Sequence, residues 1–117
     1  MMPYERLEAW RLCHQLALAV YQITKSWPKF ELYGLITQAR RAAFSAPVTM
    51  AEGSAKRGKR EFRRFLDIAN GSLAELAYIL RLAHDPGYLD SKEWLRAEEV
   101  RVRAAQLTWR LYQSMGP

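Results

Sequence analysis

Residues 38–75 read QARRAAFSAPVTMAEGSAKRGKREFRRFLDIANGSLAE. Two segments rich in small and apolar residues flank a run of Lys and Arg that glycines interrupt. This pattern is typical of a helical hairpin with a charged tip. Positions 40–64 hold eight basic and two acidic residues, and that surplus of six equals the +6 net charge of the chain. The rest of the sequence is therefore electrically balanced.

Composition indicates a single packed domain spanning residues 1–117, because half of the residues are apolar. Cys13 is the only cysteine, so no internal disulfide can form and a reducing compartment fits. The segment MMPYERLEAW lacks the apolar core of a secretory signal, and the uncharged run at 12–24 is too short to cross a bilayer. We expect a cytoplasmic protein without a membrane role. The pI of about 9.8 favours an anionic partner.

Apolar residues recur at steps of three and four in four segments, which predicts four helices. Their expected bounds are Tyr4–Lys25, Glu31–Glu52, Lys59–Ala83, and a fourth helix capped by Ser91 and reaching Ser114. Gly53 is expected to end the second helix in the left-handed conformation. Because the connections are short, we expect an all-α, antiparallel, up-down-up-down four-helix bundle.

Pro47 lies inside the second predicted helix. It removes the amide that would bond to the carbonyl of Ala43, and its ring collides with that carbonyl. The helical periodicity nevertheless continues to Glu52. The sequence therefore predicts a kink at Pro47 and not a helix end.

The hairpin has an expected register. Folding the chain about residues 55 and 56 would place Ala42 near Ala69 and Ala39 near Ser72. Gly71 costs a helix about 1 kcal/mol relative to alanine. We expect a close helix crossing beside the alanines to offset that cost.

The fourth helix carries two apolar seams. One consists of Trp94, Ala97, Ala104, Leu107, Leu111 and Met115; the other consists of Leu95, Val102, Ala105, Trp109 and Tyr112. A monomeric bundle needs one such face. The second seam is either a wide core contact or an oligomer interface.

An ordered set of motifs spans residues of about 5 to 112. It comprises residues 21–28, ELYGL at 31–35, Gln38, RRAA at 40–43, Ser45, Pro47, AEG at 51–53, Arg57, Lys59, EF at 61–62, RFL at 64–66, IA at 68–69, GSL at 71–73, EL at 75–76 and GYL at 87–89. With these motifs the chain resembles the small four-helix-bundle proteins encoded in intervening sequences of bacterial large-subunit ribosomal RNA genes. Related to them are the accessory variability determinant proteins of diversity-generating retroelements.

This resemblance implies a homo-oligomer, commonly a pentamer, and it does not imply an enzyme activity. Its retroelement branch implies contact with nucleic acid and with a reverse transcriptase. Thr49 departs from the pattern, because family members usually carry Asn two residues after the proline. A bridging role for that amide does not carry over to this chain.

The candidate nucleic-acid-binding residues are basic. They are Lys56, Arg57, Lys59, Arg60, Arg63 and Arg64, with Arg40 and Arg41 as lesser candidates. Positive charge at a helix start opposes the helix dipole, which favours a bound anion over a purely solvated surface. Phe62 and Phe65 follow the core face, so base stacking is not expected and binding should be weakly sequence-specific.

Catalysis has little support in the sequence. It contains no phosphate-binding glycine loop, no metal-ligand cluster and no nucleophile with a placed base, so we expect no cofactor and no metal. Cys13 and His14 fit ordinary helix positions, and Glu52 and Glu61 fit salt bridges. The sequence therefore predicts a non-enzymatic, homo-oligomeric adaptor that contacts RNA or DNA. The alternative is a protein-interaction scaffold with no nucleic-acid role.

Overall fold

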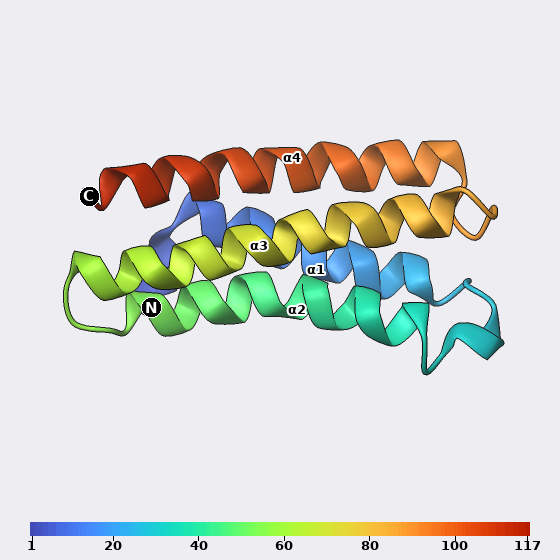
Figure 1. Ribbon diagram of the computed structural model, residues 1–117, viewed down its shortest axis with the longest axis horizontal. Helices are drawn as coiled ribbons and strands as arrows, with labels where there is room; N and C mark the ends of the chain where they lie inside the picture. Colours follow the sequence, from blue (N-terminus) through green and yellow to red (C-terminus); the bar gives the residue numbers. More distant parts are fainter.

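The computed structural model describes residues 1–117 and consists of four long helices packed side by side (Figure 1). Two short 3-10 turns, η1 and η2, precede the first and second long helices. The elements are η1 Pro3–Arg6, α1 Glu8–Thr24, η2 Lys29–Glu31, α2 Leu35–Ser54, α3 Lys59–His84 and α4 Ser91–Ser114. The expected all-α four-helix bundle is confirmed.

Contacts between α2 and α3 show that these helices run in opposite directions. Arg41 pairs with Glu75, and Ser45 bonds to Ser72 at 2.8 Å. Residue numbers therefore fall along α3 as they rise along α2. Each long helix returns along the preceding one in Figure 1, and α1 packs on α4, where Cys13 Sγ lies 3.9 Å from Thr108 Oγ1.

The expected hairpin register is wrong. Ser45, and not Ala39, lies opposite Ser72, a difference of six residues, or about 9 Å along α2. The connection includes Gly58, which has a φ of 84°, and α3 begins at the next residue, Lys59. In this register, α3 projects past the last turn of α2 at the tip (Figure 1).

Two helix starts lie later than the sequence indicated. Leu7 has an extended backbone with a ψ of 123°, so α1 begins at Glu8. Glu31 does not begin the second helix: its Oε1 accepts a hydrogen bond from the amide of Leu35 at 3.2 Å. This carboxylate satisfies one of the unpaired donors at the start of α2.

Gly53 does not end α2 in a left-handed conformation. The helix continues to Ser54, and the glycines with positive φ are Gly58, Gly87 and Gly116. Gly53 is instead needed for space, since a Cβ there would lie 2.6 Å from the Cβ of Phe65. The absence of a side chain lets α3 approach α2 at the base of the tip.

Gly71 shows the reverse situation. A Cβ placed on it would meet nothing within 4 Å, so the expected close crossing at this glycine is wrong. Pro47 is buried inside α2, which continues past it; the kink stays a prediction.

The core draws on all four helices, and α2 contributes alanines to it. Its members include Leu16, Ala42, Met50, Leu73 and Ala104. The start of α4 is capped by Asp90, whose Oδ1 accepts from the amide of Glu93 at 2.8 Å. Ser91, the expected cap, is the first residue of the helix.

The second seam of α4 is divided between the core and solvent. Ala105 and Tyr112 pack against the core. Leu95, Val102 and Trp109 stay 63%, 43% and 50% exposed. These three, spaced seven residues apart, form one outward row, called here the α4 row.

Candidate nucleic-acid interface

The tip of the α2–α3 hairpin carries a dense run of positive side chains without acidic partners. Lys56, Arg57, Lys59 and Arg60 are exposed, and none of them forms an ion pair with an acidic side chain. Gly58 makes the turn between them. The chain thus presents four free cations to solvent within five residues.

Arg64 is partly neutralised. Its Nη2 lies 3.2 Å from Glu61 Oε2, and both side chains are about half exposed, so the pair adds little stability. This contact confirms the salt-bridge interpretation of Glu61. Glu52 is exposed and forms no ion pair.

Phe65 supports two of the tip cations. The Nζ of Lys56 lies 5.7 Å from its ring centroid, and the Cζ of Arg64 lies 4.8 Å from it. Cations within about 6 Å of an aromatic face are attracted by the ring quadrupole. The ring therefore contacts two cations from separate segments of the hairpin, of which Lys56 has no acidic partner.

Arg63 turns toward α4 and not toward solvent. Its Cζ lies 4.1 Å from the ring centroid of Tyr112, and its buried Nε has no hydrogen-bond partner. It lines a cleft of about 620 Å³ between the start of α3 and the end of the chain. The other lining residues are Arg60, Glu61, Arg64, Asp67, Tyr112 and Pro117.

Arg40 lies away from the tip. It precedes the end of α2 by 14 residues, about 21 Å at 1.5 Å per residue. Its Nε donates to Thr24 Oγ1 at 2.9 Å, and its Cζ lies 5.1 Å from the Tyr21 ring centroid. Arg40 therefore joins α2 to α1.

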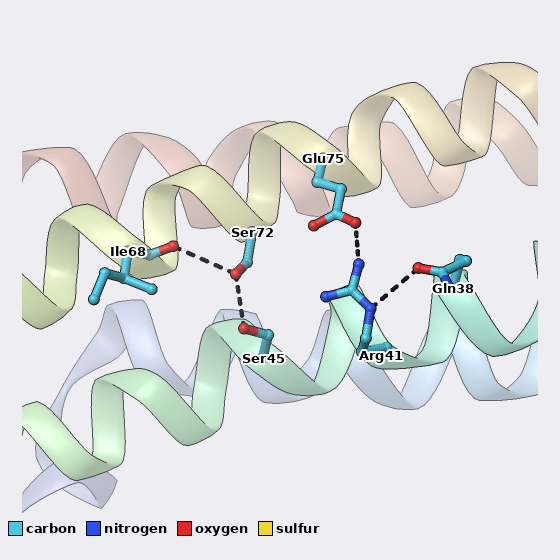
Figure 2. Close-up of polar contacts among 6 residues, drawn as sticks. All are labelled: Gln38, Arg41, Ser45, Ile68, Ser72 and Glu75. Carbon is cyan, nitrogen blue, oxygen red and sulfur yellow. Dashed lines mark hydrogen bonds and ion pairs between the residues drawn. The ribbon is translucent and has the colours of Figure 1, made fainter.

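Arg41 joins α2 to α3. Figure 2 shows its guanidinium between Gln38 and Glu75, with the bonded Ser45 and Ser72 about one turn closer to the tip. The charge of Arg41 is compensated by Glu75. The fold thus gathers six of the eight basic candidates and leaves Arg40 and Arg41 outside.

The sequence reasoning missed the aromatic side chains that α4 brings to this end. Tyr112 lies against Arg63, and Trp109 stacks on Tyr112 with centroids 5.1 Å apart and ring planes 19° apart. Only the antiparallel return of α4 makes these residues neighbours of the tip. The sequence feature that could have indicated them is the spacing of Trp109 and Tyr112, which are three residues apart and so share one face of a helix.

The remaining titratable candidates lie elsewhere in ordinary environments. Cys13 is buried, and burial raises the pKa of its thiol to about 11, which leaves it protonated near pH 7. His14 stacks on Trp10, and His84 stacks on Trp94. No three His, Cys, Asp or Glu side chains gather in a group able to hold a metal ion.

Comparisons with known proteins identify the family. The model of the 23S rRNA-intervening sequence protein family matches residues 5–110, which include all four helices up to the last turn of α4. A search of curated proteins finds no match. None of the helices combines the length and apolar character needed to cross a membrane. The chain therefore belongs to the family of 23S rRNA-intervening sequence proteins.

Proposed function

We propose that this protein is a non-enzymatic, homo-oligomeric adaptor that binds the phosphate backbone of RNA or DNA through the hairpin tip. One observation carries the proposal: of the six basic residues at 56–64, only Arg64 has an acidic partner. Elsewhere, Arg11, Arg41, Arg81 and Arg101 are paired, and the cations without an acidic partner, such as Arg96 and Arg103, lie farther apart in the sequence. An anion bound at the tip would meet several unpaired cations at once.

The placement of the charge supports an anionic ligand. Lys59, Arg60 and Arg63 occupy the first turns of α3. Positive charge at a helix start is repelled by the helix dipole, which lowers stability by some tenths of a kcal/mol per residue. Arg60 and Arg64 also form a like-charge pair at i and i+4, which is mildly unfavourable. A phosphate bound at the tip would add attractive interactions that offset both of these unfavourable terms.

Self-association would increase the effect of each tip. Leu95 and Val102 of the exposed α4 row give the chain apolar surface outside its core. We propose a closed homo-oligomer, with the five copies that the family resemblance implies. In a ring, several tips act on one polyanion, and linked contacts raise the apparent affinity without any new contact.

The test is a titration with structured RNA, single-stranded DNA and duplex DNA at several salt concentrations. If several tip cations meet phosphates, affinity should fall steeply between roughly 50 and 200 mM salt. Replacing Arg60, Arg63 and Arg64 by Gln should weaken binding to all three ligands while circular dichroism keeps its helical signal.

A matched control has the same charge change away from the tip. The triple variant Arg81→Gln, Arg96→Gln, Arg103→Gln should bind much more tightly than the tip variant. If the wild type binds none of the three ligands at low salt, the nucleic-acid proposal fails. A protein-interaction scaffold is then the better account.

A further inference from the structure

The tip cations and the aromatic rings of α4 form one continuous array. It runs from the guanidinium of Arg63 to the ring of Tyr112 at 4.1 Å, and from Tyr112 to Trp109 at 5.1 Å between ring centroids. Arg60 and Arg64 line the same cleft as Arg63 and Tyr112. Positive charge and an aromatic surface therefore lie side by side, on helices distant in sequence.

Trp109 is held in place yet half exposed. The ring of Tyr112 stacks nearly parallel to the ring of Trp109, while half of the surface of Trp109 remains open to solvent. By contrast, Trp27 is almost fully buried. A large ring that is supported by another ring and open to solvent can accept a flat ligand without rearrangement.

The cleft beside this array is lined by more basic than acidic side chains. Arg63 Nε is buried and has no hydrogen-bond partner, and a buried donor left unpaired is unfavourable. Glu61 is engaged with Arg64, and Asp67 is the other acidic side chain in the cleft. The three arginines exceed the two carboxylates by one positive charge. A phosphate would compensate that excess and can accept hydrogen bonds from several guanidinium donors at once.

We propose that this surface is a binding site for single-stranded nucleic acid, in which one base stacks on Trp109 and a neighbouring phosphate enters the cleft at Arg63. This deepens the proposed function and rests on it. A single strand is the ligand that fits, because an unpaired base can present its face to an aromatic ring, whereas bases inside a duplex are already stacked. The sugar type is left open by these contacts.

The competing occupant of Trp109 is a second copy of the chain. Trp109 continues the α4 row with Leu95 and Val102, so a self-interface could cover all three. Trp109 differs from Leu95 and Val102 because Tyr112 and Arg63 lie next to it. The guanidinium of Arg63, whose Nε has no hydrogen-bond partner, is complementary to an anion and not to an apolar surface. Measuring mass and binding on the same variants separates these two occupants.

The experiment compares the wild type with Trp109→Leu, which keeps an apolar side chain and removes the aromatic face. The ligands are single strands of about 12 nucleotides in RNA and DNA form, a DNA duplex, and an abasic DNA strand with the same phosphates. We expect Trp109→Leu to weaken binding of base-containing single strands about 5- to 100-fold. Duplex and abasic affinities should stay within about twofold, and light scattering should give an unchanged mass.

Two control variants define the effect. Trp109→Phe retains an aromatic ring and should recover most of the affinity. Tyr78→Leu removes an exposed aromatic ring from α3, outside the cleft, and should bind like the wild type. Tryptophan fluorescence should be quenched by the single strands in the wild type and much less in Trp109→Leu.

The inference fails if Trp109→Leu binds single strands like the wild type, weakens all four ligands equally, or lowers the oligomer mass. If the tip triple variant loses affinity while Trp109→Leu does not, phosphate binding stands and only the stacking site is wrong. If the wild type binds no single strand at low salt, this inference and the proposed function fail together. Weaker RNA than DNA binding, or the reverse, identifies the preferred sugar.

Discussion

At the scale of single residues, the two interior glycines of the hairpin have opposite roles. Gly53→Ala should lower the free energy of unfolding by about 1–3 kcal/mol, because its Cβ would overlap Phe65 between two packed helices. Gly71→Ala should raise it by about 1 kcal/mol, since the new methyl group meets open space and alanine is the better helix former. Urea denaturation of both variants checks the signs.

The effect of Gly71→Ala also depends on whether the protein is an oligomer or a monomer at the concentration used. If Gly71→Ala destabilises the protein at concentrations where it is oligomeric and stabilises it as a monomer, another copy occupies the space beside Gly71. If Gly71→Ala destabilises the monomer as well, the conclusion that a Cβ at this position meets open space is wrong.

Cys13 provides a residue-scale test of core packing. Its thiol is buried and its pKa is raised to about 11 by that burial, so thiolate is scarce below pH 9 in the folded protein. Alkylation by iodoacetamide at pH 8 should therefore be slow in buffer and fast in denaturing urea, with mass spectrometry as the readout. Equal rates in both solvents would mean that the α1–α4 core opens readily.

At the scale of elements, the sequence predicted the four helices because each carries its own apolar periodicity. Helix ends depended on local backbone details that periodicity does not report. Glu31 satisfies a backbone donor at the start of α2 from outside it, and Asp90, not Ser91, caps α4. A residue-type pattern cannot distinguish a carboxylate that caps a helix from one inside its first turn.

The hairpin register was wrong for a different reason. It depends on where the connection turns; the pairing of Ser45 with Ser72 centres the hairpin near Gly58, which has a positive φ, and not on residues 55 and 56. Ser45 and Ser72 then meet at 2.8 Å. Pairing across two helices is a non-local property, which no single-helix pattern contains.

At the scale of the whole molecule, the charge cluster could be predicted and the aromatic half of the candidate site could not. The basic residues at 56–64 are neighbours in sequence, so their proximity required no fold. Tyr112 and Arg63 are 49 positions apart and meet only through the antiparallel return of α4. Arg40 and Arg41 were grouped with this cluster from the sequence, but they lie more than three turns of α2 away from the tip.

The proposed assembly also belongs to this scale. Light scattering at micromolar concentration should give a mass about five times the chain's 13.6 kDa. Leu95→Ser with Val102→Ser should lower that mass, because both side chains are exposed on the α4 row and contribute little to the monomer core. Leu18→Ser, an exposed leucine on α1, is the matched control. A wild-type mass near 13.6 kDa would refute the oligomer.

The start of α3 at the hairpin tip has a consequence for motion. The amides of residues 59–61 precede the first helical hydrogen bond of α3, from Phe62 N to Gly58 O, so they lack the intrahelical acceptor that protects later amides. These amides should exchange with deuterium orders of magnitude faster than those of the buried middle of α3. A bound polyanion should slow that exchange selectively, so the segment that carries the charge would also become ordered as the ligand binds.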